Sequence, residues 1–220
     1  MSSIKLKHSG GNSVSLNPPS SAPTSSDVAF KLPNADGSAN QVLKTDGSGN
    51  LSFAADAGGK FESYAVISDT KPSNHNGGTA TADTWNTRAL NTEIADPDGI
   101  VSISSNQFTL QAGSYLIKFQ CCAHMVHRHM TALYDVTNTA FKQYGMIAYA
   151  NIDNVQNFSQ GVARVTISGT TVYEIRHAVQ DTRNTDGFGI SSQFDSSGDY
   201  NYGTSDTESI YTIVEIYKES

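Results

Sequence analysis

The stretch SYLIKFQCCAHMVHRHM, residues 114–130, indicates the fold class most directly. Apolar side chains occupy most of its odd positions, whereas Lys118 and Gln120 stand at even positions. Because successive side chains of a β-strand point to opposite faces, this period of two predicts a strand with one face in a core. Cys121 falls on the core face, where it would act as a small buried side chain, and His124 falls on the other face.

The histidines of this stretch raise the question of a metal site. His124 cannot share a ligand shell with Cys121, since the two face opposite ways. A turn near residues 126–128 would place His127 and His129 on one side of the next strand. Two imidazoles supply at most half of a tetrahedral zinc shell, and the sequence offers no third ligand. We therefore expect packing and no cofactor; the alternative is a ring of His127 or His129 around a subunit axis.

Alternation of this kind recurs along the chain, and no window shows the apolar spacing of an amphipathic helix. We therefore predict an all-β protein. About ten candidate strands separated by Gly, Asn, Asp and Ser turns predict an antiparallel jelly-roll sandwich beyond residue 58. Both faces of the last strand carry large side chains, which places it centrally or at a subunit interface. The predicted strands are 61–68, 83–92, 100–110, 114–125, 128–137, 139–149, 160–168, 171–179, 187–194 and 209–219.

The first region of the chain, residues 1–57, differs from the rest. Its apolar runs are short, and Asp36-Gly37 and Asp46-Gly47 stand between the later ones, where Asp-Gly favours tight hairpin turns. Its large apolar side chains are few for a free-standing core, so we expect it to borrow burial from copies of itself or from another protein. The Gly-rich segment at 54–60 indicates a boundary to a second domain, residues 58–220.

Composition excludes several classes of function. The formal net charge of −7 and the lack of a basic run oppose binding to nucleic acid. No stretch approaches the ~20 apolar residues that cross a bilayer, and residues 1–20 lack a signal-peptide pattern, so we expect neither membrane insertion nor export. Cys121 and Cys122 are adjacent, which disfavours a disulfide between them. Motifs of hydrolases, P-loop proteins and zinc enzymes are missing, and an enzyme is not expected.

Acidic residues offer weak alternatives to this view. The segment ADPDG, residues 95–99, invites a calcium interpretation, but a turn before the next strand explains it more simply. Asp195 and Asp199 form a second weak candidate for a divalent ion. A glycosidase would need paired carboxylates, and Glu174 and Glu215 are the strand glutamates considered; we expect each to face solvent.

The polar segment at 180–207 is the candidate binding surface. Long loops on a β-scaffold commonly carry recognition, and Arg and aromatic side chains supply contact area at low entropic cost. The alternative is that these aromatics hold the loop against its own sandwich. The candidate contact residues are Arg183, Phe194, Tyr200 and Tyr202.

A family resemblance agrees with these expectations. KLPNADGSANQVLKTDGSGNLSF, residues 31–53, resembles the N-terminal module of tail-fibre-like and other virion proteins of marine tailed phages. The remainder resembles the C-terminal domains of the same proteins. Within it FTLQAGSYLI, residues 108–117, and IYTIVEIYKE, residues 210–219, look like the C1q and tumour-necrosis-factor type of jelly roll.

The resemblance implies a homotrimeric component of the virion. Its N-terminal module would trimerise and attach to other tail or capsid proteins, while a jelly-roll head displays loops to a host-surface glycan or protein. The apolar second faces of strands, such as Met130-Ala132-Tyr134 and Tyr211-Ile213, would then be buried between subunits. We expect a short fibre or adhesin; the alternative is a capsid decoration or cement protein.

Overall fold

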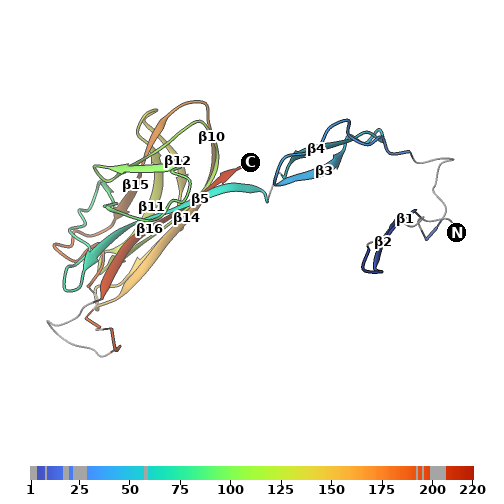
Figure 1. Ribbon diagram of the computed structural model, residues 1–220. Helices are drawn as coiled ribbons and strands as arrows, with labels where there is room; N and C mark the ends of the chain where they lie inside the picture. Colours follow the sequence, from blue (N-terminus) through green and yellow to red (C-terminus); the bar gives the residue numbers. More distant parts are fainter. Residues whose placement is uncertain are drawn as a thin grey trace. The chain divides into compact units, whose positions relative to one another are not determined.

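The protein forms two compact units, Met1–Ala57 (unit 1) and Gly58–Ser220 (unit 2), seen in Figure 1. Strands, turns and bends make up the described residues, which include no helix long and apolar enough to cross a membrane. The all-β prediction is confirmed. The computed structural model describes residues 4–7, 9–16, 20–21, 29–56, 59–191, 193–194, 196–198 and 207–220.

The described residues of unit 1 form two antiparallel hairpins. The turn of the second lies at the predicted Asp46-Gly47, where an Asp46 side-chain oxygen accepts a hydrogen bond from the backbone N–H of Ser48 (2.7 Å) and Gly47 has φ +81°. Asp36-Gly37 is not a hairpin turn; a Cβ at Gly37 would lie 2.6 Å from the ring of Phe53, so this glycine allows a close approach instead. The hairpins are β1 (Ile4–Lys7) with β2 (Ser13–Leu16), and β3 (Gln41–Thr45) with β4 (Leu51–Ala55).

The described side chains of unit 1 include none that is buried. Large apolar groups lie on its surface instead, among them Leu32, which is 78% exposed, and Phe30, which is 62% exposed. Unit 1 therefore has no hydrophobic core of its own among these residues.

Unit 2 is a sandwich of two antiparallel sheets. Neighbours within each sheet are mostly distant in sequence, and consecutive strands such as β10 and β11 lie in opposite sheets, which is the winding of a jelly roll. The predicted jelly roll is confirmed, while the trimer stays a prediction. The five-stranded sheet runs β14 (Gln156–Ile167), β10 (Gly113–His124), β16 (Glu208–Glu219), β5 (Phe61–Pro72), β7 (Thr92–Ala95). The seven-stranded sheet runs β12 (Ala140–Tyr144), β11 (His127–Asp135), β15 (Thr171–Val179), β9 (Gln107–Leu110), β8 (Val101–Ser104), with β13 (Ala148–Ala150) on β11 and β6 (Trp85–Thr87) on β15.

The strand β10 alternates as its sequence predicts. Its odd residues from Tyr115 to Cys121 are at most 2% exposed and belong to the core between the sheets. The opposite face differs from the expectation near the end of the strand, because Cys122 and His124 are buried as well. A loop covers them there: the Cys122 thiol donates to the carbonyl of Phe188 at 3.2 Å.

The predicted strand 83–92 is wrong, because this segment crosses from one sheet to the other. After β6, the N–H of Arg88 donates to the carbonyl of Ile175 in the seven-stranded sheet (2.8 Å). Before β7, the N–H of Asn91 donates to Ser68 in the five-stranded sheet (2.9 Å). Sequence alternation treats Arg88 as a solvent-facing residue of one strand, because arginine usually points to solvent. In the structure the crossing segment buries Arg88 instead.

Three other predicted strands also differ. The stretch 139–149 divides into β12 and β13, because between them the N–H of Gly145 donates to Thr131 (2.8 Å) and the N–H of Met146 to Gln160 of the other sheet (2.7 Å). The stretch 100–110 is a hairpin, β8 to β9, whose turn places Ser105 and Asn106 at φ 52° and 64°, the left-handed pair typical of a type I′ turn. The stretch 187–194 is irregular, since its backbone bonds go to another loop: the N–H of Phe188, for example, donates to Gly78 at 3.0 Å.

The last strand, β16, lies centrally between β10 and β5, as one of the two predicted alternatives states. A β-bulge between Ile210 and Thr212 reverses the predicted facing at its start. Ile210 is therefore 51% exposed, whereas Tyr211 is only 3% exposed and its hydroxyl donates to the carbonyl of His75 at 2.7 Å. Tyr211 packs within its own chain, which corrects its expected place at a subunit boundary.

Candidate binding site at the distal loops

Three loops meet at one end of unit 2. The N–H of Ser220 donates to the carbonyl of Lys60 (3.2 Å), so the chain enters unit 2 and finishes β16 at the same end. From there β5 runs to Pro72 at the opposite end, where the loops 73–84, 151–155 and 180–191 lie. We call these the distal loops.

Backbone hydrogen bonds hold the distal loops together. Ala80 and Arg183 exchange both backbone bonds (2.8 and 2.9 Å), and the N–H of Gly77 donates to Gly189 (2.8 Å). A Cβ at Gly77 would lie 2.2 Å from the carbonyl oxygen of Phe188, so only glycine allows this approach. The first part of the predicted binding segment is thus anchored to the sandwich.

Arg183, a predicted contact residue, is engaged within its own loop. Its Nε and Nη2 donate to the two carboxylate oxygens of Asp186 at 2.7 and 3.0 Å. This fork-shaped pair lowers the pKa of Asp186, chiefly through the hydrogen bond from Arg183. The Arg183–Asp186 pair therefore holds the conformation of the loop. A ligand could contact only the part of the Arg183 side chain that stays exposed.

Asp186 also contacts a buried histidine. Nδ1 of His124 lies 3.3 Å from Asp186, and its Nε2 lies 3.0 Å from the side-chain oxygen of Asn154. These contacts link the loops 151–155 and 180–191. Both ring nitrogens of His124 are directed at these loop side chains, so we assign His124 a role in positioning the loops.

The remaining predicted contact residues are only partly described. Phe194 is half exposed, and its carbonyl accepts a hydrogen bond from the Thr207 hydroxyl (2.5 Å). Tyr200 and Tyr202 lie outside the described residues. The same holds for the candidate ion ligands Asp195 and Asp199.

The two histidines considered for a subunit axis have separate partners inside one chain. His127, at φ 56°, pairs through Nδ1 with the carboxylate of Asp181. His129 is buried, and its Nδ1 lies 2.9 Å from Nε2 of His177. A ring of His129 side chains from several subunits is therefore wrong, since the sandwich itself encloses this residue. The described residues show no group of three or more His, Cys, Asp or Glu able to hold a metal ion.

A buried arginine beneath the distal loops is the main feature that sequence reasoning missed. Arg88 donates from Nε to the Thr212 hydroxyl (2.9 Å), and from Nη2 to the carbonyls of Tyr211 (2.7 Å) and Phe188 (3.3 Å). Its guanidinium also lies 4.2 Å from the centre of the Phe188 ring. Arg88 therefore ties the five-stranded sheet to the loop 180–191, and no local pattern in its sequence signals this.

Burial and the Arg88 cation set the protonation of the histidine pair. Desolvation first, and Arg88 second, lower the pKa of His129 to about 4 and that of His177 well below its usual range. Burial also raises the pKa of Cys121 to about 11. Both histidines are thus neutral near pH 7, and this thiol is protonated and not a nucleophile.

The structure shows the role of two acidic residues that the sequence singled out. Asp96 accepts hydrogen bonds from the N–H groups of Ile100 (2.8 Å) and Val101 (3.0 Å), so the structural turn is confirmed. Glu174 does not face solvent as expected: it is buried, and its carboxylate accepts from Gln107 and Arg176. Gln107 comes from the neighbouring strand β9, and Arg176 lies two residues further along β15 itself; alternation alone indicates neither contact.

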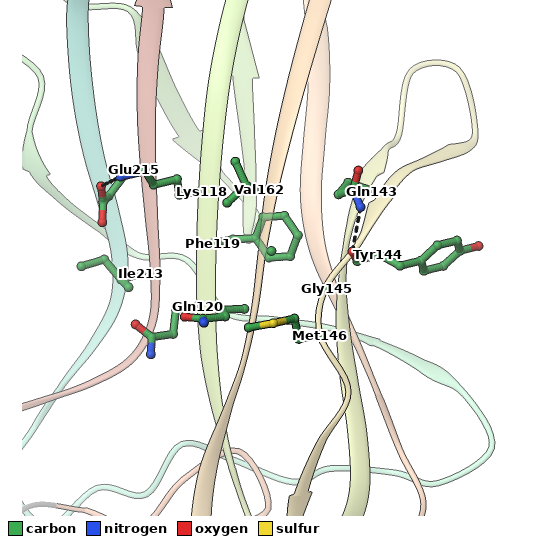
Figure 2. Close-up of a pocket in the computed structure, with 12 residues that line it drawn as sticks. Lys118, Phe119, Gln120, Gln143, Tyr144, Gly145, Met146, Val162, Ile213 and Glu215 are labelled. Atoms are coloured by element: carbon green, nitrogen blue, oxygen red, sulfur yellow. Dashed lines mark hydrogen bonds and ion pairs between the residues drawn. The ribbon is translucent and has the colours of Figure 1, made fainter.

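A groove of about 440 Å³ lies on the outer face of the five-stranded sheet, walled by residues 143–146 (Figure 2). The ion pair between Lys118 and Glu215 (3.3 Å) lies at one side of it. A Cβ at Gly145 would lie 2.8 Å from the carbonyl oxygen of Gln160, so glycine lets the wall approach β14. The sequence offered no sign of this groove.

The comparisons with known proteins concern the fold. No protein-family model matches the sequence, and no curated protein matches it. Among solved structures, the chain is similar to the globular domain of zebrafish complement 1qA protein (TM-score 0.41, 15% identity, 70% of this chain and 95% of that chain). It is also similar to murine APRIL (0.42, 9%, 70% and 98%) and to Eiger TNF from S. frugiperda (0.43, 11%, 71% and 92%). Function and assembly are not inferred from these likenesses.

Proposed function

We propose that this chain is a structural protein of a phage virion, a short trimeric fibre or tail-fibre-like adhesin. The proposal that copies of the chain assemble rests on unit 1, which buries none of its described side chains and exposes Leu32 and Phe30. Isolated hairpins are marginally stable, and their apolar residues stabilise a fold only when another surface covers them. Copies of unit 1 provide that cover, and unit 1 also joins the protein to the particle. The resemblance of residues 31–53 to phage modules supports both attachment to a phage particle and a trimeric assembly.

Unit 2 offers two unlike apolar surfaces for the same assembly. One is the outer face of the five-stranded sheet, where exposed Val162 lines the groove and exposed Tyr64 lies on β5. Contact between this face on one copy and a different surface on the next is heterologous, and such contacts form a ring of three when the rotation between copies closes after three steps. The second surface, which we call the apolar edge, consists of Met146, Ile147, Ile152, Val155 and Phe158.

The position of the distal loops supports a role in display. They lie at the end of unit 2 opposite the entry at Lys60, so a protein held through unit 1 leaves them available. Phe194 offers a half-exposed aromatic ring beside them. We propose that this end contacts the host surface and that the protein has no catalytic role.

Light scattering tests the trimer. The full chain should have the mass of three 23.5 kDa subunits. Ile147→Asp, at an apolar-edge residue that is 72% exposed, should lower the mass, because a charge there is desolvated in the contact. Ser102→Asp, at an exposed position of β8, is the matched control and should leave the mass unchanged. A strict monomer for the unsubstituted chain would falsify the assembly.

Binding of the labelled full chain to host cells tests the adhesin. We expect saturable binding that weakens in Phe194→Ala. Absence of binding to cells and to their extracted surface polysaccharide would rule out host attachment. Release of reducing ends from that polysaccharide would instead indicate an enzyme.

Capsid decoration is the second candidate, because the uncovered apolar surface of unit 1 also suits a capsid lattice. An image of the particle with the protein labelled separates the two. Density on the tail supports the fibre, and density across the capsid lattice supports decoration.

A further inference from the structure

Four aromatic rings gather on the outer face of the seven-stranded sheet of unit 2. They come from β6, β11 and β12. Both β6 and β11 pair with β15, and β12 pairs with β11. Ring centres lie 4.9 Å apart for Trp85 and Phe141, 5.2 Å for Phe141 and Tyr144, and 4.9 Å for Tyr134 and Phe141. We call Trp85, Tyr134, Phe141 and Tyr144 the aromatic platform.

Arg176 is built into the platform. Its guanidinium carbon lies 3.3 Å from the centre of the Tyr134 ring and 5.7 Å from that of Phe141. Its Nε donates to Glu174 at 2.6 Å, and Gln107 donates to the other carboxylate oxygen at 3.1 Å. The cation and the carboxylate neutralise each other, so they fix the rings without giving the platform a net charge.

The platform keeps hydrogen-bond donors for a ligand. The indole N–H of Trp85 and the hydroxyls of Tyr134 and Tyr144 make no hydrogen bond within the part of the chain that the structure describes. Tyr144 is half exposed, and its side chain points away from the groove in Figure 2. The half-exposed Tyr144 ring, the partly exposed Trp85 and the unused donors therefore lie together on one surface.

We propose that the aromatic platform binds a neutral glycan chain. A pyranose ring presents a C–H face that packs on an aromatic ring, and its oxygens accept hydrogen bonds from indole and phenol donors. The neutralised Arg176–Glu174 pair offers no free charge to an anionic polymer. The apolar edge, which is mainly aliphatic, suits a protein surface instead. This inference rests on the proposed host attachment and names its ligand class and residues.

Fluorescence gives a direct test, because Trp85 is the single tryptophan of the chain. The full chain is titrated with a soluble mannan, β-glucan and galactan, with heparin as the anionic comparison. We expect a saturable change in Trp85 emission with at least one neutral polymer and none with heparin. Affinity electrophoresis in the same polymer should show binding weakened at least tenfold in Trp85→Ala and in Tyr144→Ala, and largely retained in Trp85→Phe. Tyr149→Ala, at a half-exposed tyrosine of β13 outside the platform, should bind normally.

Several results would overturn the platform. One is no response to any neutral polymer; another is a Trp85→Ala protein with native circular dichroism that binds as well as the unsubstituted chain. A changed oligomeric mass in Trp85→Ala with glycan binding intact would make the platform a protein contact. If Trp85→Ala loses nothing while Phe194→Ala loses host-cell binding, the platform fails and the proposed function stands. If the unsubstituted chain binds no host cell, the proposed function fails first.

Discussion

Units 1 and 2 are both built from antiparallel strands, yet only unit 2 encloses an interior. In unit 1 the hairpin of β3 and β4 has its backbone paired, while its apolar Val42, Leu43 and Phe53 stay exposed. In unit 2 the same kind of pairing lies in two facing sheets, so residues such as Ile117 and Ile216 lose all contact with water. Backbone pairing alone does not stabilise a hairpin; a second apolar layer does.

The comparison extends to polar groups. A second layer in unit 2 permits buried groups such as Arg88 and the His129–His177 pair, because carbonyls and ring atoms replace water around them. Unit 1 has no described interior that could hold such a group. The two units should therefore respond very differently to separation, substitution and pH.

Separating the units should have the largest effect. We expect a peptide of residues 1–57 to show no cooperative unfolding when dilute, since its described side chains bury nothing. Residues 58–220 should retain β-type circular dichroism and a cooperative melt. A dilute, monomeric 1–57 peptide with a sharp melt would contradict the comparison.

Removing the buried arginine should be the next largest effect. Arg88→Met removes the guanidinium that donates to the carbonyls of Tyr211 and Phe188 and leaves them only the weak thiol donor of Cys122, and we expect a loss of about 3–5 kcal/mol of unfolding free energy in urea. Arg164→Met is the control: Arg164 is an exposed arginine paired with Glu219, and its replacement should change the unfolding free energy far less than that of Arg88. Equal effects would show that Arg88 does not tie the sheet to the loop.

Acid should weaken unit 2 in a defined window. The folded state holds His129 neutral down to about pH 4, whereas the unfolded chain takes up the proton near 6.5. The unfolded state thus binds more protons between these values, and stability is full above pH 6.5 and falls towards pH 4, by roughly 3 kcal/mol for this residue.

Denaturant melts at several pH values check this window. The variant His129→Gln should show a flatter profile between pH 6.5 and 4, even if it is less stable throughout. The salt-bridged Asp186 contributes below its usual pKa of 3.8, outside the window. An unchanged slope in the variant would remove His129 as the cause.

Overpacking one glycine should have the smallest effect. A Cβ at Gly161 would lie 2.3 Å from the Phe119 ring, so Gly161→Ala should cost about 1–3 kcal/mol as the core adjusts. Gly169→Ala, where nothing lies within 4 Å, should be nearly neutral. Thermal melts of the two variants measure the difference directly.

Much of the scaffold follows from sequence. Alternation along β10 identifies its core face, and Asp46-Gly47 identifies a hairpin turn, because strand period and turn geometry are local properties. The composition shift at residues 54–60 coincides with the division between the units. The shortage of apolar residues in 1–57 matches its lack of described buried side chains.

Only the tertiary structure decides which polar residues are buried and which side chains share a site. In the sequence Arg88 resembles a solvent-facing strand residue, whereas the crossing segment buries it between the sheets. His129 contacts His177, which lies 48 residues further along the chain. The aromatic platform likewise joins Trp85 to Phe141 across the sheet. Sequence pattern reports which face a side chain takes, but what covers that face depends on chain segments that only folding brings together.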